Sequence, residues 1–167
     1  MNKAVFLDRD GTINVDKGYL YKIEDFEYLP GAVEGLRLLQ NQGYLLIIVT
    51  NQSGIARGYY TEEDYKKNDG WLKADLESKG VHISASYYCP HLPDAPVAKY
   101  RCECECRKPR TGLFWQARKD FDIDMSRSIA IGDKNRDLAI CQEAPVKGIL
   151  LGKDAVDWNE IICKLKS

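Results

Sequence analysis

Short apolar segments alternate along this chain with segments that carry apolar residues at helical spacing. The apolar segments cover residues 4–7, 44–49, 83–88, 128–131 and 148–151. Helical spacing covers residues 33–39, 65–79, 113–121, 138–143 and 156–165. Strands connected through helices pair in parallel, and helices then cover both faces of the sheet. The alternation therefore predicts an α/β fold with a mainly parallel sheet, in which ligands bind beyond the carboxyl ends of the strands.

Two of the expected helices carry start and stop signals. A Pro-Gly pair precedes the first helical segment, and Gly43 ends it. Thr61 stands three residues before Asp64, which is the spacing of a capping box and predicts a helix start. Residues 68–70, Asn-Asp-Gly, are expected to weaken that second helix. Cys141 and Cys163 fall in helical apolar patterns and are expected in the core.

Length and composition agree with one domain over residues 1–167. The chain is 44% hydrophobic and carries a formal net charge of −1, so it offers no general attraction for nucleic acid or an anionic membrane. No apolar run approaches the roughly 20 residues that cross a bilayer, and the N-terminus lacks a signal-peptide pattern. We therefore expect a cytoplasmic monomer without nucleic-acid or membrane partners.

Two aspartates, Asp8 and Asp10, follow the first apolar segment directly. Two carboxylates spaced i, i+2 at a strand end can share one divalent cation, and Gly11 lets the backbone turn sharply. One carboxylate is then free to attack phosphorus. The alternative for Asp-x-Asp-Gly-Thr is a plain turn before a helix, because Asp and Gly favour turns and Thr often caps helices.

Further polar motifs follow in order and favour a catalytic site over a plain turn. Residues 50–54, Thr-Asn-Gln-Ser-Gly, follow the second apolar segment and offer groups that hold phosphate oxygens. Arg107 and Lys108 are adjacent cations. Residues 132–137, Gly-Asp-Lys-Asn-Arg-Asp, bring more carboxylates to the end of another apolar segment. We expect these motifs to meet at one edge of the sheet.

The four motifs resemble those of the haloacid dehalogenase-like (HAD) phosphatases, and the resemblance spans nearly the whole chain. It implies a Rossmann-like fold of three layers, α/β/α, and a phosphoric monoester hydrolase. Asp8 would be the nucleophile and Asp10 the general acid and base. Thr50 would bind a phosphate oxygen, and Lys108 would stabilise charge. A carboxylate nucleophile divides hydrolysis into formation and breakdown of an aspartyl phosphate, in which one residue serves as acid and then as base.

The resemblance also implies a catalytic magnesium ion. Asp8, the main-chain carbonyl of Asp10, and Asp133 would bind it, which agrees with the preference of this ion for oxygen ligands. Asp137 keeps two interpretations. It either orients Lys108 or a metal-bound water, or it caps the helix that follows.

Four of the six cysteines lie between residues 89 and 106. Five candidate ligands compete there for four places: Cys89, His91, Cys102, Cys104 and Cys106. Thiol clusters in cytosolic chains seldom form disulfides, and this donor set favours a tetrahedral zinc site. Unligated thiols are the alternative, disfavoured because they oxidise readily. Four protein ligands leave no open position, so the zinc is predicted to be structural and to fix the cationic pair that follows the loop.

The cysteine pattern narrows the resemblance. Cys-x-His followed by Cys-x-Cys-Arg-Lys-Pro is similar to a small branch without a large cap domain, which contains D,D-heptose 1,7-bisphosphate phosphatases and histidinol-phosphate phosphatases. That pattern implies Cys89, His91, Cys104 and Cys106 as the zinc ligands, with Cys102 as an extra thiol. Residues 10–19 and 50–58 are similar to the heptose enzymes in particular. Ser53 stands where histidinol-phosphate phosphatases typically have Asp.

The resemblance to the heptose enzymes implies removal of the C7 phosphate from a heptose bisphosphate, on a route to bacterial surface glycans such as lipopolysaccharide or S-layer glycans. Implied substrate contacts are Asp16, Lys17, Gly18, Tyr19, Thr50, Asn51, Gln52, Ser53, Arg107, Lys108 and Lys134. A bisphosphate needs a second anion site, for which Arg107, Lys17 and Arg57 are candidates, although each is also an ordinary surface residue type.

Two other functions remain possible on the sequence. One is a phosphatase of the same branch that acts on histidinol phosphate or another small monoester. The other is a zinc-stabilised binding module without catalysis. The presence of Asp8, Asp10, Lys108 and Asp133 argues against the binding module.

Overall fold

Five strands form one parallel sheet in the computed structural model, which describes residues 1–167. They are β1 (Ala4–Leu7), β2 (Leu45–Asn51), β3 (Ile83–Cys89), β4 (Ile129–Gly132) and β5 (Lys147–Leu150). Their order is β3-β2-β1-β4-β5, and every neighbouring pair is parallel. From β1 the chain adds β2 and β3 on one side and then β4 and β5 on the other side. The direction of the strand order therefore reverses between β1 and β4, which is where open α/β sheets bind ligands.

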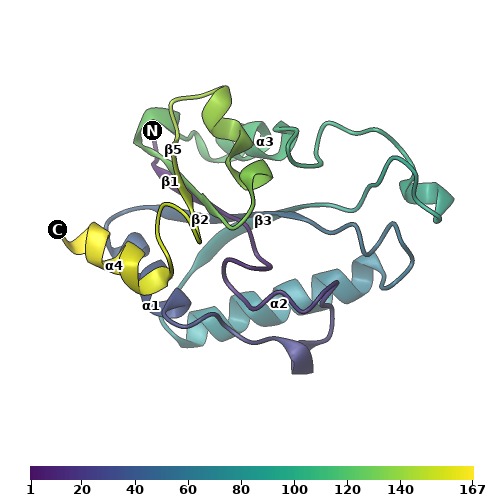
Figure 1. The fold of residues 1–167 in the computed structure, drawn as a ribbon, viewed down its shortest axis with the longest axis horizontal. Coiled ribbons are helices and arrows are strands. Elements are labelled where there is room, and N and C mark those ends of the chain that lie inside the picture. Colours follow the sequence, from purple (N-terminus) through teal and green to yellow (C-terminus); the bar gives the residue numbers. More distant parts are fainter.

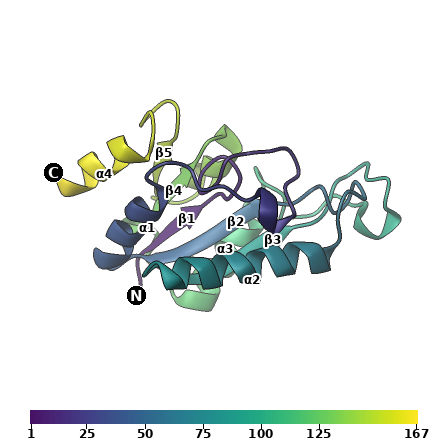
Figure 2. The same cartoon turned by 90° about the horizontal axis from the view of Figure 1, so that it is seen from below.

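Helices cover both faces of the sheet (Figures 1 and 2), which confirms the predicted three layers. One face carries α1 (Ala32–Asn41), α2 (Glu62–Ser78) and α4 (Trp158–Lys166). The other carries α3 (Gly112–Phe121) and the 3-10 helix η4 (Asn135–Gln142). Alternate residues of β1 serve the two faces, because Val5 packs in the first core and Phe6 in the second.

Helix α2 begins with the predicted capping box. The Thr61 hydroxyl accepts from the Asp64 amide and the Asp64 carboxylate accepts from the Thr61 amide, both at 3.0 Å. The helix then continues unbroken to Ser78, so the expected weakening at residues 68–70 is wrong. Asn68 is fully buried and hydrogen-bonded through its side chain, so it does not compete for the helix backbone.

Three further expectations need correction. Strand β2 includes Thr50 and Asn51, because these residues pair with Tyr88 and Cys89 of β3. The helix expected at residues 138–143 is the tighter η4, which begins earlier. Cys163 lies on the exposed side of α4 rather than in the core.

The carboxyl edge of the sheet is flanked by two irregular segments. Residues 11–28 lie on the side of α2, and residues 90–111 extend from the end of β3 as a long loop at the right of Figure 1. Trp158 of α4 fixes the start of the first segment, because its buried indole donates to the Thr12 carbonyl at 2.6 Å. None of the helices has the length and apolarity that spanning a membrane requires.

Candidate active site and metal sites

The buried cation Lys108 joins the predicted nucleophile to the rest of the site. Its ammonium donates to Asp8 Oδ1 at 3.0 Å, to Asp137 Oδ1 at 2.6 Å and to the Val49 carbonyl at 2.7 Å. Only 2% of Lys108 is exposed. Three oxygens therefore fix the charge beside Asp8, which stands at the end of β1.

Asp137 performs both of the functions that the sequence left open. Its Oδ1 orients Lys108, and its Oδ2 accepts from the Lys134 amide at 3.0 Å at the start of η4. Gly132 makes this possible, because a Cβ at that position would lie 2.2 Å from the Asp137 Cβ.

Asn51 holds the Lys108 backbone from the end of β2. Its side-chain oxygen accepts from the Lys108 amide at 2.9 Å, and its side-chain nitrogen donates to the Lys108 carbonyl at 3.1 Å. Asn51 also lines the cavity, so it touches the pocket as well as supporting the cation. Thr50 is 1% exposed, and its hydroxyl accepts from the Gln52 amide group at 2.9 Å.

Burial and charge act in opposite directions on the two central groups. Burial raises the pKa of Asp8 to about 8, although the Lys108 ammonium lowers it, and the Asp137 and Asp10 carboxylates raise it further. Burial lowers the pKa of Lys108, but the Asp8 and Asp137 carboxylates raise it above its ordinary value. Lys108 therefore stays charged, whereas Asp8 needs additional positive charge to be fully ionised at neutral pH.

The carboxylates fit a divalent cation. Oxygens of Asp8, Asp133 and Asp137 lie within 4.8 Å of one another. Asp133 Oδ1 is buried without a hydrogen-bond partner, and burial followed by the Asp137 charge raises the pKa of Asp133. Gly11 (φ 88°) admits this carboxylate, because a Cβ there would lie 2.2 Å from Asp133 Oδ2. An oxygen-only donor set with an unsatisfied atom suits a hard ion such as Mg²⁺.

The carboxylate of Asp10 lies outside that group and is held by other side chains. Arg9 Nη2 donates to its two oxygens at 3.2 and 3.1 Å. Asn14 donates to Oδ1 at 3.0 Å, and Gln52 donates to Oδ2 at 3.3 Å. The arrangement leaves 23% of the Asp10 side chain exposed, and Asp10 lines the cavity. Only its main-chain carbonyl was predicted to contact magnesium.

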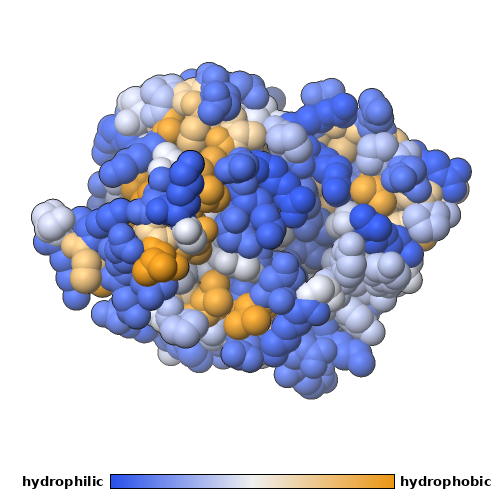
Figure 3. All heavy atoms as spheres, in the orientation of Figure 1, coloured by the Kyte–Doolittle hydropathy of each residue, from blue (hydrophilic) through white to orange (hydrophobic).

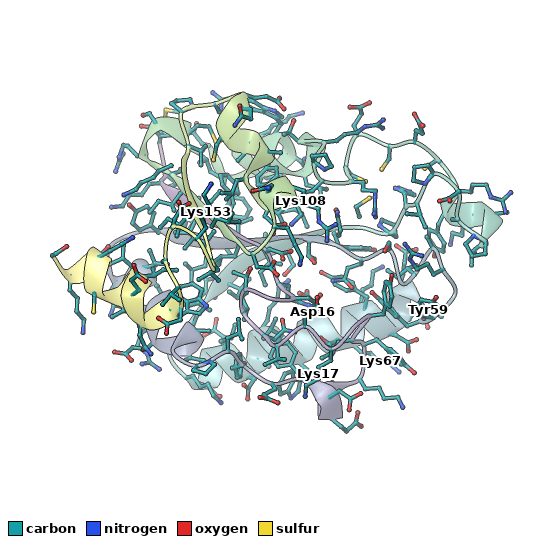
Figure 4. All side chains as sticks on the ribbon, in the orientation of Figure 1. Asp16, Lys17, Tyr59, Lys67, Lys108 and Lys153 are labelled. Carbon is teal, nitrogen blue, oxygen red and sulfur yellow. The ribbon has the colours of Figure 1, made fainter.

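A cavity of about 340 Å³ opens above these groups. The predicted site residues that line it are Asp8, Asp10, Asp16, Gly18, Tyr19, Asn51, Gln52, Ser53, Arg107, Asp133 and Lys134. Figure 3 shows a hollow right of centre whose surroundings are mostly hydrophilic. In Figure 4, which has the orientation of Figure 3, Lys108 on the loop before α3 and Asp16 on the segment that crosses over α2 lie on opposite sides of this hollow.

Three of the predicted site residues do not line the cavity, whereas Arg57, a candidate for the second anion site, does. Thr50 and Lys108 do not line the cavity because they are buried next to lining residues. Lys17 does not line the cavity and pairs with Glu27 at 3.2 Å (Figure 4). Arg57 does line the cavity, and its guanidinium lies over the Tyr19 ring at 5.4 Å.

The rim of the cavity is cationic although its floor is anionic. Its cations are Arg57, Arg107, Lys134 and Arg136. Arg107 Nη1 is buried without a hydrogen-bond partner, so no protein acceptor engages this donor. A molecule with two separated anionic groups fits this distribution, with one group at the floor near Lys108 and the candidate metal site and the other at the rim.

The predicted zinc ligands meet at the base of the long loop. Cys106 Sγ lies 2.8 Å from Cys89 Sγ and 3.3 Å from Cys104 Sγ, and His91 Nδ1 lies 3.4 Å from Cys106 Sγ. Cys102 is exposed and lies outside this group. The hydrogen bond shared with Cys89 lowers the pKa of Cys106 to about 5, so a thiolate is available to a metal. Three sulfurs and one imidazole match a closed tetrahedral zinc site.

Several residues of the site escaped the sequence analysis. They are Arg9, Asn14, Tyr60, Asn68 and Arg136. Asn68 carried a usable signal, because it shares a helical stripe with buried Tyr65, Leu72 and Leu76. Arg9 carried none, because the direction of a side chain at the end of a strand depends on partners far along the chain.

Comparisons with known proteins agree with this geometry. A family model described as polynucleotide kinase 3 phosphatase matches residues 3–144. A D-glycero-beta-D-manno-heptose-1,7-bisphosphate 7-phosphatase of Haemophilus ducreyi is 49% identical over 87% of this chain and 80% of the relative. A D-glycero-alpha-D-manno-heptose-1,7-bisphosphate 7-phosphatase of Photorhabdus laumondii is 47% identical over 95% of this chain and 86% of the relative.

A solved structure shares the fold over almost the whole length. The D,D-heptose 1,7-bisphosphate phosphatase from B. bronchiseptica, complexed with magnesium and phosphate, superposes with a TM-score of 0.82. It is 26% identical, and the match covers 98% of each chain. The names of the sequence relatives and of the structural neighbour agree on the reaction, and the neighbour shares the fold. The chain belongs to the HAD-like phosphatases, in the branch of the heptose 1,7-bisphosphate phosphatases.

Proposed function

We propose that this enzyme is a magnesium-dependent phosphatase that removes the C7 phosphate from D-glycero-D-manno-heptose 1,7-bisphosphate. The observation that carries the proposal is the cavity itself. Asp8 lies at its floor and accepts from the buried Lys108 ammonium behind it at 3.0 Å, and its rim carries Arg57, Arg107, Lys134 and Arg136. One phosphate would lie at the floor and the other at the rim, as a bisphosphate requires. The names of the relatives support this substrate.

Asp8, Asp133 and the main-chain carbonyl of Asp10 would hold the magnesium ion. When bound, the ion supplies positive charge that favours ionised Asp8 and stabilises charge on the phosphate oxygens. Asp137 contributes indirectly, because its carboxylate holds the Lys108 ammonium at 2.6 Å. The B. bronchiseptica neighbour, which contains magnesium and phosphate, supports this assignment.

The first step transfers the phosphoryl group to the enzyme. An Asp8 oxygen attacks phosphorus and forms a new P–O bond, while the bond from phosphorus to the C7 oxygen breaks. The electron pair of that bond stays on the C7 oxygen, which takes a proton from the Asp10 carboxyl group. Lys108 balances the charge on the transferred group, because its ammonium is fixed before the reaction begins.

The second step releases phosphate. The Asp10 carboxylate, which gave its proton in the first step, now takes a proton from water. The water oxygen that loses this proton attacks phosphorus, and the bond from phosphorus to Asp8 breaks. Inorganic phosphate leaves and Asp8 returns as a carboxylate. Heptose 1-phosphate is the other product, which we propose enters the synthesis of activated heptose for a bacterial surface glycan. A cytoplasmic, monomeric enzyme remains our prediction.

A substrate panel tests the assignment. We expect kcat/KM for one anomer of heptose 1,7-bisphosphate to exceed that for histidinol phosphate by about 10²-fold, because the second phosphate adds charged hydrogen bonds worth roughly 1.5–3 kcal/mol each. Phosphate release with magnesium measures this ratio. A 3′-phosphorylated oligonucleotide belongs in the panel, since the matching family model is described as a polynucleotide phosphatase. Preference for histidinol phosphate or the oligonucleotide would contradict the proposed substrate.

We propose that the cluster of Cys89, His91, Cys104 and Cys106 binds structural zinc. It closes the loop that leads directly into Arg107 and Lys108, so it fixes the backbone that presents both cations. The Lys108 backbone is then held from two sides, by the zinc loop that precedes it and by the hydrogen bonds of the Asn51 side chain. Zinc would thus support catalysis without touching the substrate.

The zinc assignment predicts different outcomes for two neighbouring cysteines. Cys104→Ala is expected to lower bound zinc well below one equivalent and to lower Tm by roughly 2–4 °C for each kcal/mol lost. Cys102→Ala is the matched control and is expected to keep both values, because Cys102 is exposed and lies outside the cluster. Metal analysis and thermal unfolding measure the two effects. Zinc loss in Cys102→Ala with full zinc in Cys104→Ala would reverse the assignment.

A further inference from the structure

The residue between Asp8 and Asp10 in the sequence is a buried arginine, Arg9. Arg9 is 1% exposed, and its side chain turns toward α2 instead of the cavity. Nη1 donates to Asn68 Oδ1 at 3.3 Å, and the guanidinium lies over the Tyr65 ring at 5.8 Å. Nη2 donates to both oxygens of Asp10. A charged side chain thus connects helix α2 to the proposed acid and base.

The burial of Arg9 is costly for the fold. A buried guanidinium must be paired, and Arg9 Nε has no partner at all. Its partner Asn68 occupies the stripe of α2 on which Leu72 and Leu76 are apolar and fully buried. A fold optimised only for stability would place apolar residues at positions 9 and 68. The arrangement therefore points to a requirement of the site.

Arg9 is the only charged group among the donors that hold Asp10. Asn14 and Gln52 each donate one neutral hydrogen bond, at 3.0 and 3.3 Å. Arg9 contacts both oxygens from one nitrogen, so it restricts rotation of the carboxylate. Asp10 must donate a proton in one step and accept one in the next, and both transfers depend on its direction.

The same guanidinium also holds the segment that lines one side of the cavity. Nη2 donates to the Leu20 carbonyl at 3.3 Å, directly after Tyr19. Asn68 donates to the Tyr21 carbonyl at 3.2 Å. Arg9 and Asn68 therefore form one hydrogen-bond network that connects α2, the segment at residues 16–21 and Asp10. Movement of this segment would be transmitted to the acid and base through Arg9.

We infer that Arg9, anchored by Asn68, is a positioning residue that fixes the Asp10 carboxylate for proton transfer to and from the substrate. The inference rests on the proposed function, because it assumes that Asp10 is the acid and base. It goes further by predicting that the loss of kcat/KM in Arg9 variants depends on the leaving group of the substrate. An alkoxide leaving group needs the proton from Asp10, whereas a nitrophenolate leaves without it. The bond from phosphorus to the leaving oxygen breaks in both cases, and Asp8 takes the phosphoryl group.

Two substrates of similar size separate positioning from general damage. These are p-nitrobenzyl phosphate, whose leaving group is an alkoxide, and p-nitrophenyl phosphate, whose leaving group is a stable phenolate. The values of kcat/KM report the steps up to phosphoryl transfer, so they isolate the proton donation by Asp10. Asp10→Asn provides the reference, with an expected loss of about 10²-fold or more for the benzyl ester and a much smaller loss for the phenyl ester.

Arg9→Lys is the first test variant, because it keeps the charge and loses the planar contact with both oxygens. We expect kcat/KM for the benzyl ester to fall by about tenfold or more, within the 10²-fold that a 1 Å misplacement can cost. The loss for the phenyl ester should stay within about threefold. Asn68→Ala, which keeps Arg9 but removes its anchor, should show a smaller loss in the same direction and remains informative if Arg9→Lys does not fold.

Tyr28→Phe is the matched control for contact between the irregular segment and α2. Tyr28 donates to Asp75 at 2.6 Å and so joins the same irregular segment to the helix without touching Asp10. Its ratio of the two kcat/KM values should equal that of the wild type. Equal losses on both esters in Arg9→Lys and Asn68→Ala, or no loss on either, would overturn the inference.

The reference reactions distinguish this failure from failure of the proposed function. If wild-type enzyme releases no phosphate from either ester or from the heptose bisphosphate, the proposed function fails first. If Asp10→Asn shows no dependence on the leaving group, Asp10 is not the acid and the inference falls with it. If Asp10→Asn shows the dependence and the Arg9 and Asn68 variants do not, the inference alone is contradicted.

Discussion

Asp8→Asn is expected to abolish phosphate release, with a loss of about 10⁴-fold or more, the order found when a nucleophile is removed. The amide keeps the shape of the carboxylate but cannot form the ester bond to phosphorus. Neighbouring groups cannot replace it, because Asp137 is engaged by Lys108 at 2.6 Å and by the Lys134 amide at 3.0 Å. Initial rates with saturating magnesium measure the loss.

The same variant carries a prediction for stability. Burial raises the pKa of Asp8 to about 8 from an ordinary 3.8, so the folded state binds this proton more tightly than the unfolded state. The contribution of Asp8 to stability is therefore present below pH 4 and is lost as the pH rises toward 8. Asn carries no such charge, so the metal-free variant should unfold at an equal or higher Tm at pH 8.

Zinc content provides the control for Asp8→Asn. It should remain at the wild-type value, since the proposed zinc ligands lie on the loop at residues 89–106. A variant that retains zinc and fold but keeps magnesium-dependent activity within tenfold of the wild type would contradict the aspartyl-phosphate mechanism. A loss of fold in this isosteric variant is not expected, because no larger side chain enters the core.

Lys108→Met should lower both kcat and stability. Loss of a preorganised charge is expected to reduce kcat by about 10²-fold or more. It also leaves the Asp8 and Asp137 carboxylates unpaired in a buried place, and breaking such a pair costs about 3–5 kcal/mol. Tm should then fall by roughly 2–4 °C for each kcal/mol.

Two comparisons make the Lys108 experiment specific. Lys153→Met is the control, because Lys153 is exposed and lies away from the cavity (Figure 4). Lys108→Arg should not restore activity, since the guanidinium is larger than the slot formed by three oxygens around the ammonium. A Lys108→Met enzyme with near-normal kcat would show that this cation does not act on the transferred phosphoryl group.

Local rules in the sequence predicted much of the fold. The alternation of strands and helices predicted the parallel sheet, and the spacing of Thr61 and Asp64 predicted the start of α2. The order of strands was not predictable in this way, because it depends on which apolar faces pack together. The expected weakening of α2 at residues 68–70 was wrong for the same reason, since Asn68 has its hydrogen-bond partner 59 residues away in Arg9.

The site shows a similar division. Aspartates at the strand ends were predictable, because the carboxyl ends of parallel strands meet at one edge. Long side chains were less predictable. Lys17 pairs with Glu27 outside the cavity, and Arg57 reaches the rim from a neighbouring loop. Asn51 was predicted to contact substrate, and its hold on the Lys108 backbone appeared only with the folded arrangement.

For the predicted zinc ligands, the family resemblance gave a choice that residue chemistry alone did not. Chemistry alone left five candidates for four places. Similarity to the heptose phosphatases selected four of them, and the structure brings those four within 4.8 Å of one another while leaving Cys102 exposed. The choice follows from the reach of the loop, since Cys104 and Cys106 return to the end of β3 where Cys89 lies.

The most direct measurement of the central claim is ³¹P NMR of heptose 1,7-bisphosphate during turnover with magnesium. The account predicts that the C7 phosphate signal disappears, inorganic phosphate appears in equal amount, and the C1 phosphate signal stays. This outcome is expected because the rim cations hold one phosphate while Asp8 and Lys108 act on the other. Loss of the C1 phosphate first, or of both phosphates together, would contradict it.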